Sequence, residues 1–114
     1  MKNAALLWVG AGGAIGSMLR YLVGRAWPHG TLIVNVVGCL AIGFIVSRWS
    51  LEESARGFWV VGLLGGFTTF SAFGLETLNL LREGAYLPAA GNVAAQLLLG
   101  VGAAAVGFAL GKGI

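Results

Sequence analysis

Four long apolar stretches take up most of the chain and leave only short connections between them. The stretches cover residues 4–23, 31–47, 58–81 and 88–110. A helix needs about 20 mainly apolar residues to cross the hydrocarbon core of a bilayer, and each stretch is close to that length. The connections are too short to hold a catalytic domain. The pattern therefore predicts an all-α integral membrane protein, in which residues 1–114 form one domain of four transmembrane helices.

Composition excludes several classes of protein. Hydrophobic residues make up 58% of the chain and charged residues only 10%, a balance that is unusual for a soluble globular domain. Cys39 and His29 are the only cysteine and the only histidine, which excludes disulfide frameworks, multi-ligand zinc sites and Ser-His-Asp triads. No basic stripe is long enough to bind nucleic acid. We therefore expect neither an enzyme nor a nucleic-acid-binding protein, and we place the function within the lipid bilayer.

The basic residues are divided almost equally between the two sides of the membrane. With four spans, both ends of the chain lie on one side. That side then holds Lys2, Arg48, Arg56 and Lys112, and the other side holds Arg20, Arg25 and Arg82. Orientation follows the bias of lysine and arginine in short loops, and this bias is small. The balance predicts dual topology, with an antiparallel homodimer formed by two oppositely inserted copies. The alternative is a single topology set by an assembly partner.

The third apolar stretch contains a segment that disfavours a regular helix at its centre. This segment reads Gly65-Gly66-Phe67-Thr68-Thr69-Phe70-Ser71-Ala72-Phe73. Two adjacent glycines cost a helix interior about 2 kcal/mol relative to alanines, and the hydroxyls compete for backbone hydrogen bonds. We expect the third helix to break at mid-membrane, from Gly65 to Thr68. Irregular backbone at that depth persists only where protein, an ion or a polar cavity satisfies it, so the break indicates an ion site or a pathway.

The first stretch combines small residues with an arginine. Gly12, Gly16 and Gly24 recur at intervals of four together with Arg20, so all four share one helix face. The glycines favour close packing of another helix. An arginine just inside a membrane end either faces a water-filled cavity or extends toward the interface. Arg20 is therefore a candidate for a vestibule that attracts anions, with an interfacial position as the alternative.

The second and third stretches carry further polar and aromatic candidates. Asn35 shares a helix face with Thr31 and Gly38. It either joins helices by hydrogen bonds or donates N–H groups to a passing anion. Phenylalanines 67, 70 and 73 recur at intervals of three and either pack in the core or present their positive ring edges to an anion. Glu76 is a functional candidate because it is an intramembrane carboxylate, unless it pairs with an arginine near the interface.

In order and spacing, these motifs resemble the bacterial fluoride channel family, Fluc. The matching pieces are Gly12-Gly13-Ala14-Ile15-Gly16 with Arg20-Tyr21, Trp27-Pro28-His29-Gly30-Thr31-Leu32 with Val34-Asn35, and the segment from Gly65 to Phe73 with Glu76. The resemblance covers the first three apolar stretches, and the third motif is specific.

This resemblance implies an antiparallel dual-topology dimer with two pores that exports fluoride passively across the bacterial plasma membrane. It implies that Phe70 and Phe73 line the pore, that Asn35 is the pore amide and that Arg20 lies in the vestibule. It also implies a structural sodium ion at the dimer centre, held by the backbone carbonyls of Gly65 and Thr68. The expected partners are fluoride, lipid and a second copy of the chain.

The fourth stretch departs from the family pattern. Relatives tend to place a tyrosine and then serines or threonines where this chain has Asn92, Gln96 and Gly100. Amides still offer N–H donors. The predicted fluoride pathway therefore also includes Asn92, Gln96, Thr31, Thr69 and Ser71, with Glu76 as a further candidate. Ala72 stands where a threonine is common. These departures leave open a changed conduction rate or a second, differing subunit.

Three other functions remain as alternatives. A small dual-topology multidrug exporter is similar in length and span number, but it requires a glutamate embedded in the first span, and this first stretch has no acidic residue. A non-conducting membrane assembly protein needs only the glycine-rich faces. A proton-coupled fluoride carrier is a further alternative, because Glu76 is titratable.

Overall fold

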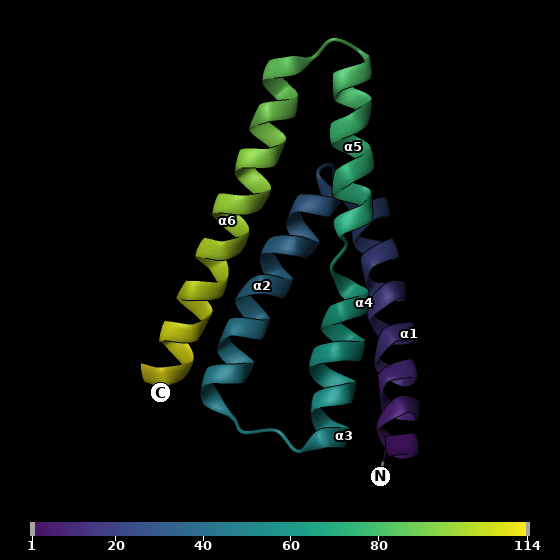
Figure 1. Ribbon diagram of the computed structural model, residues 1–114, viewed down its shortest axis with the longest axis vertical. Helices are drawn as coiled ribbons and strands as arrows, with labels where there is room; N and C mark the ends of the chain where they lie inside the picture. The colour runs from purple at the N-terminus through teal and green to yellow at the C-terminus, as the bar shows by residue number, and fades with distance from the viewer. Residues whose placement is uncertain (1, 114) are drawn as a thin grey trace.

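The computed structural model describes residues 2–113, so residues 1 and 114 of the predicted domain lie outside the described residues. The described part of the chain is helical and contains no strand. Its elements are α1 (Lys2–Ala26), α2 (Gly30–Arg48), α3 (Glu53–Arg56), η1 (Gly57–Leu64), α4 (Gly65–Phe67), α5 (Phe70–Arg82) and α6 (Tyr86–Gly113). Elements α3 to α5 follow one another as a single interrupted rod (Figure 1). We call this rod the third span.

Within residues 2–113, four helical segments are long and apolar enough to cross a membrane. They lie in α1, in α2, in the third span (Glu53–Arg82) and in α6. The prediction of an all-α chain with four membrane spans is therefore confirmed. The connections are short, and the α5–α6 turn passes through Gly84, whose φ of 76° is easy for glycine and unfavourable for other residues. Such tight turns keep consecutive spans close together.

The helices pack as two glycine-lined pairs. In the first pair, α1 lies against η1: a Cβ added at Gly12 or Gly16 would collide with a backbone carbonyl of η1. In the second pair, α2 lies against α6, where a Cβ at Gly43 or Gly107 would meet backbone in the same way. Lipid tails are as apolar as leucine, so membrane helices associate through close packing of this kind. The predicted packing role of Gly12 and Gly16 is confirmed, whereas no atom outside its own helix backbone lies within 4 Å of a Cβ at Gly24.

Within the third span, Gly57–Leu64 form a π-helix, η1, which was not predicted from the sequence. A π-helix closes its hydrogen bonds between residues i and i+5, and it is rare beyond a single turn. The carbonyls of Phe58 and Leu63 in η1 face Gly12 and Gly16 of α1. We infer that these glycines matter because they give the wider helix room to approach α1.

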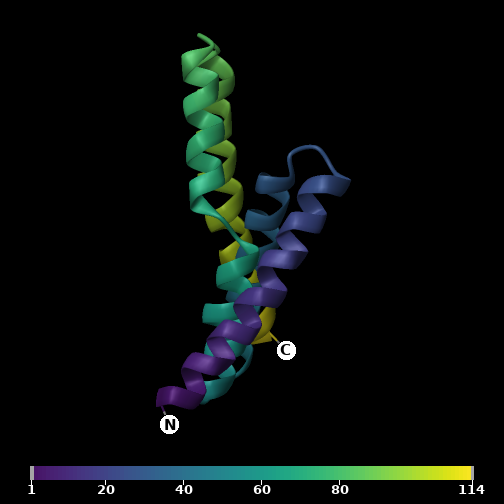
Figure 2. The ribbon, with the colours of Figure 1, turned by 90° about the vertical axis from the view of Figure 1, so that its right-hand side faces the viewer.

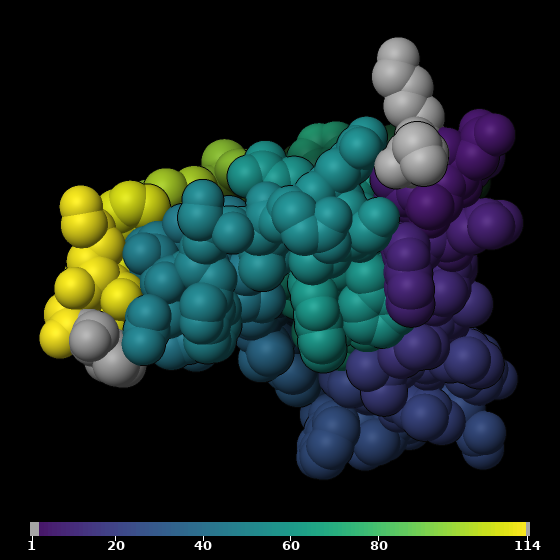
Figure 3. Space-filling view, turned by 90° about the horizontal axis from the view of Figure 1, so that it is seen from below, coloured from purple at the N-terminus to yellow at the C-terminus, as the bar shows by residue number. Residues whose placement is uncertain are grey.

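The molecule divides above the break in the third span. Figure 2 shows α5 and the first part of α6 running together, away from α1 and the α1–α2 turn. Seen from below, the end of α6 and the start of α1 lie on opposite sides, with η1 between them (Figure 3). The break therefore lies where the upper α5–α6 arm joins the lower helices.

The apolar core of the single chain is small. Its buried hydrophobic residues are Val34, Leu64, Phe73 and Ala89. Large apolar side chains cover the outside instead, including Leu7, Leu87 and Leu98, each more than two-thirds exposed. Exposed apolar surface of this extent marks contact with lipid or with another protein surface.

Candidate functional site

The third span is interrupted at Thr68 and Thr69. Both residues are extended, with φ and ψ of −90° and 162° at Thr68 and −153° and 123° at Thr69. The predicted break is therefore present near the middle of the span, and the expected competition by a threonine hydroxyl contributes to it, but the two glycines do not interrupt the helix. Gly65 and Gly66 remain helical in α4. A Cβ at Gly66 would lie 2.7 Å from the Gly13 carbonyl oxygen, so Gly66 allows close approach to α1 and does not itself interrupt the helix.

Side chains hold the break open by taking two backbone N–H groups out of the helix. The Thr69 N–H donates to Asn35 Oδ1 at 2.8 Å, and the Ala72 N–H donates to Thr69 Oγ1 at 3.2 Å. In a continuous α-helix these two N–H groups would donate to the carbonyls of Gly65 and Thr68. The break therefore deprives the two predicted sodium-binding carbonyls of their usual helical partners.

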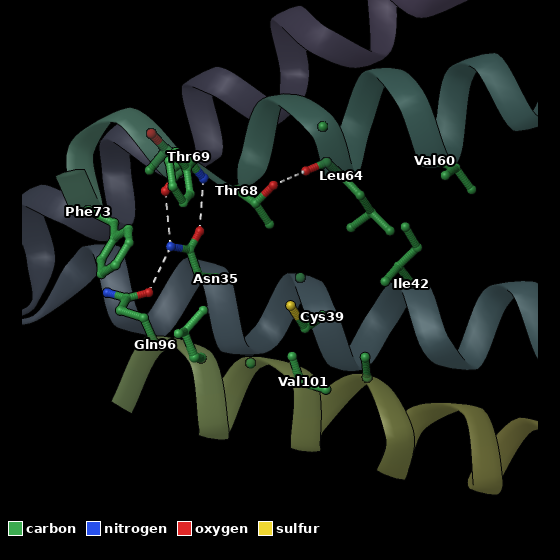
Figure 4. A pocket seen from close by; sticks show the side chains of 16 residues that line it. Asn35, Cys39, Ile42, Val60, Leu64, Thr68, Thr69, Phe73, Gln96 and Val101 are labelled. Atoms are coloured by element: carbon green, nitrogen blue, oxygen red, sulfur yellow. Dashed lines mark hydrogen bonds between the residues drawn. The ribbon is translucent and has the colours of Figure 1, made fainter. Parts of the chain in front are cut away.

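Asn35 joins the break to both neighbouring helices. From α2, its Nδ2 donates to the Thr69 carbonyl at 3.0 Å and to Gln96 Oε1 of α6 at 2.9 Å (Figure 4). With the bond from the Thr69 N–H to Oδ1, both the nitrogen and the oxygen of the Asn35 amide are therefore hydrogen-bonded. We call Asn35, Thr69 and Gln96 the amide hub. Its hydrogen bonds connect the second, third and fourth spans at one point.

Gln96 is the most deeply buried member of the hub. Its side chain is 8% exposed, and Gln96 Nε2 is the one buried side-chain nitrogen or oxygen without a hydrogen-bond partner among the described residues. Leaving a buried donor unpaired costs about 1–3 kcal/mol. Native proteins keep few such groups, and each calls for an explanation.

The two phenylalanines of the predicted pore lie beside the hub but differ in burial. Phe73 is 9% exposed, whereas Phe70 is 80% exposed on the single chain. Their ring centroids are 5.4 Å apart with the planes tilted by 60°. Phe67, the first of the aromatic series, does not line the groove described next. The structure thus separates the three rings that spacing alone had grouped.

A groove of about 460 Å³ opens beside the hub and extends down the lower helices. Its upper end is lined by Asn35, Thr69, Phe70, Phe73 and Gln96. Its lower end is mainly apolar and is lined by residues that the sequence analysis did not single out, among them Ile42, Val60, Leu64, Val101 and Ala104. Their ordinary hydrophobic character gave no signal of this role, because any membrane helix is rich in such residues.

Arg20 and Glu76 make separate contacts at the edges of this region. Arg20 is half-buried, and its Nε donates to the Gly66 carbonyl at 2.9 Å. This contact turns the side chain toward the third span. Glu76 is exposed, and its Oε2 accepts from the Thr31 hydroxyl at 2.6 Å. The structure therefore places Thr31 with Glu76 and Arg20 with α4, outside the amide hub.

The remaining predicted pathway residues serve different local contacts. Asn92 Nδ2 donates to Thr77 Oγ1 at 3.0 Å, and Thr77 Oγ1 donates to the Phe73 carbonyl at 2.9 Å. This chain of bonds ties α6 to α5. Ser71 is exposed, and its hydroxyl lies 3.3 Å from Thr69 Oγ1. The structure brings Gln96 into the hub but leaves Asn92 and Ser71 outside the groove lining.

The chain is similar to known proteins over almost its whole length. The family model of CrcB-like proteins (camphor resistance, CrcB) matches residues 7–108. Proteins named fluoride-specific ion channel FluC are 43% identical in Chloroflexus aurantiacus, over 94% of both chains, and 44% identical in Nitrobacter winogradskyi, over 95% of both. One from Helicobacter pylori is 42% identical over 96% of this chain and 95% of its own. These matches confirm the resemblance predicted from the sequence: the chain belongs to the CrcB family, whose members include proteins named fluoride-specific ion channels.

Proposed function

We propose that this chain is a fluoride-selective passive ion channel of the bacterial plasma membrane, which exports cytoplasmic fluoride and relieves its toxicity. Its membership of the CrcB family and the names of its relatives support this proposal. The observation that carries it is the convergence of neutral hydrogen-bond donors and phenyl rings on a broken membrane helix. Asn35, Gln96, Phe70 and Phe73 all line one groove at that break.

The chemistry of this groove suits a small anion that must keep moving. Fluoride holds its water tightly, so a selective route has to replace that water with several donors along a narrow path. Conduction also requires weak enough binding for release. Amide N–H groups, hydroxyls and positive ring edges meet both demands, because none carries a full charge that would trap the ion.

Arg20 supplies positive charge away from the narrow part of the proposed path. Its Nε is bonded to the Gly66 carbonyl, which leaves the two terminal NH₂ groups as donors. We infer that Arg20 attracts anions to a vestibule beside the break. Thr31 and Glu76 would then form the polar edge of the same path. A carboxylate at that position also keeps the proton-coupled carrier as an outcome that the flux assay must distinguish.

We infer that two copies pair antiparallel to complete two such pores. Phe70 is 80% exposed on one chain, so its ring is available to a second copy. The apolar lower end of the groove and the small core also favour burial against another protein surface. An isologous dimer would repeat each contact about a two-fold axis and would generate two equivalent pathways.

The backbone at the break is chemically suited to the structural sodium ion implied by the family. Sodium is a hard cation, and the carbonyls of Gly65 and Thr68 have lost their usual helical partners to Asn35 Oδ1 and Thr69 Oγ1. These two carbonyls, with those of the second copy, would hold the ion. Bound there, sodium would supply a fixed positive charge near both pores.

The alternative functions receive less support. The multidrug exporter requires a carboxylate within the first span, and the sequence of α1 contains none. A non-conducting assembly protein would have no use for an amide hub with an unpaired buried donor. We therefore propose no enzymatic reaction and no drug transport for this chain.

Flux from liposomes tests the proposal directly. Vesicles loaded with potassium fluoride should release fluoride rapidly once valinomycin balances the charge, and vesicles loaded with chloride should not. A fluoride electrode measures the release, and protein-free vesicles are the control. Release that depends on valinomycin indicates a channel, and release driven by a proton gradient without it indicates a carrier. Equal release of both halides, or of neither, would contradict the proposed function.

A further inference from the structure

The backbone of the break sets the orientation of the Asn35 amide. The Thr69 N–H can only donate and the Thr69 carbonyl can only accept. Both point at Asn35, at 2.8 Å from Oδ1 and 3.0 Å from Nδ2. Exchanging the oxygen and nitrogen of this amide would place donor against donor and acceptor against acceptor. Asn35 therefore has one allowed orientation.

That orientation passes on to Gln96. One hydrogen of Asn35 Nδ2 serves the Thr69 carbonyl, and the other serves Gln96 Oε1 at 2.9 Å. Because Nδ2 donates, Gln96 must present its oxygen and direct its NH₂ group elsewhere. Asn35 consequently has no N–H left for an ion, whereas Gln96 has both of its own.

The NH₂ group of Gln96 lies where an anion path is proposed. It is buried and without a partner, and the side chain lines the groove together with Phe70 and Phe73 (Figure 4). Gln96 Oε1 accepts from Asn35, whose own oxygen accepts from the Thr69 N–H. Hydrogen bonds arranged in one direction polarise one another, so this chain strengthens Gln96 Nε2 as a donor while leaving it neutral.

We propose that Gln96 Nε2 donates directly to the permeating anion, and that Asn35 is a positioning residue that acts through Gln96. This inference rests on the proposed fluoride channel function. It differs from the role of pore amide that the family resemblance implied for Asn35. It also gives this chain an anion donor on its fourth span, where the family pattern of hydroxyls is absent.

Gln96 is the only glutamine in the chain, which allows a direct test. Protein made with side-chain ¹⁵N-labelled glutamine has a single labelled NH₂ group, whose amide resonances can be followed in lipid nanodiscs by NMR. Titration with sodium fluoride should shift these resonances saturably, and sodium chloride at equal concentration should not. Resonances that stay fixed under fluoride, or that respond equally to both salts, would overturn the proposal, because the amide would then be hydrated only or merely sensitive to ionic strength.

Flux measurements distinguish the donor from its positioning residue. Gln96→Met keeps the length of the side chain and removes both N–H groups, so fluoride flux should fall at least tenfold. Leu98→Met is the matched control, because Leu98 is 73% exposed and does not line the groove. Asn35→Leu, which is neutral and of similar size, should also lower flux in the parent, but it should add less than twofold to Gln96→Met. If the fold-reductions in flux of the two single variants multiply in the double variant, Asn35 is an independent donor and its positioning role is overturned.

The outcomes separate this inference from the proposed function. A parent protein that conducts fluoride while Gln96→Met conducts equally well refutes the role of Gln96 and leaves the channel intact. A parent that conducts no fluoride refutes the channel. If Asn35→Leu does not fold, the ¹⁵N titration of the parent protein still decides whether Gln96 meets the anion.

Discussion

Phe70 and Phe73 should respond differently to substitution although both line the same groove. Phe73 is 9% exposed, so truncation to alanine leaves a cavity of roughly 100 Å³. At about 24 cal/mol per Å³ the cavity alone costs about 2.4 kcal/mol, and with the lost contacts of the ring Phe73→Ala should lower the unfolding free energy by about 3–5 kcal/mol. Phe70 is 80% exposed on the single chain, so Phe70→Ala removes little packing within it and should lower the unfolding free energy of the dissociated single chain by less than about 0.5 kcal/mol, as is usual for surface positions.

The effects of substitutions at Phe70 and Phe73 on fluoride flux should not follow their effects on stability. If the rings act through their positive edges, Phe70→Ile and Phe73→Ile should both lower flux sharply, since isoleucine supplies bulk without an aromatic edge. Packing alone would cost about 1–2 kcal/mol for Phe73→Ile and would leave transport intact in the protein that folds. The predicted result is therefore a Phe70→Ile variant that is stable and poorly conducting.

Unfolding is measured on single chains, diluted in mixed detergent micelles until gel filtration shows no dimer, and fluoride release is measured from liposomes. Phe108→Ile serves as the control, because Phe108 lies on α6 away from the groove. Two results would refute the reasoning. Equal destabilisation by Phe70→Ala and Phe73→Ala would contradict the burial argument, and parental flux in both isoleucine variants would make these rings packing residues.

Three further predictions concern packing, orientation and the sodium ion. Gly16→Leu should prevent folding, seen as aggregation on gel filtration, because its Cβ would collide with the backbone of η1. Gly10→Leu is the control and should fold normally, since no atom outside its own helix backbone lies within 4 Å of a Cβ there. A folded, conducting Gly16→Leu protein would contradict the packing role. Cysteines placed at either end of a Cys39→Ala protein should label from both membrane faces in comparable amounts, and three lysines added at one end should force a single orientation; labelling from one face alone would exclude dual topology. Exhaustive replacement of sodium by a large organic cation should lower the melting temperature of the dimer. Thr68→Ser retains the carbonyl ligand, so in sodium it should have the melting temperature of the parent. An unchanged melting temperature of the parent without sodium would tell against the structural ion.

The interrupted third span shows how much of a helix break can be predicted from local sequence. Its hydroxyl-rich motif correctly indicated a break, because threonine and serine compete for backbone hydrogen bonds in any context. The exact position depended on a partner from another helix. Thr69 is extended because Asn35 of α2 takes its N–H, and no local propensity contains that contact. The same limit explains why Gly65 and Gly66 were wrongly expected to interrupt the helix.

The amide hub shows a second limit. Asn35 and Gln96 are 61 positions apart in the sequence, and each was recognisable as a polar residue that needs a partner in the membrane. Which amide keeps a free N–H depends on the direction of three hydrogen bonds. The donor and acceptor of each of these hydrogen bonds are fixed only when the helices have assembled, so sequence alone left the role of Asn35 undecided.

The sequence by itself determined the four spans and the residue types available for chemistry. The length of an apolar stretch decides whether it can cross the bilayer, and the residues within the four stretches limit the side-chain donors mainly to amides, hydroxyls and Arg20. Only the tertiary structure decided that η1 is a π-helix packed on the glycines of α1, that Phe73 is buried while Phe70 is exposed, and that Gln96 holds the unpaired donor. These features arise from contacts between residues far apart in the chain, whose geometry exists only after the helices have packed.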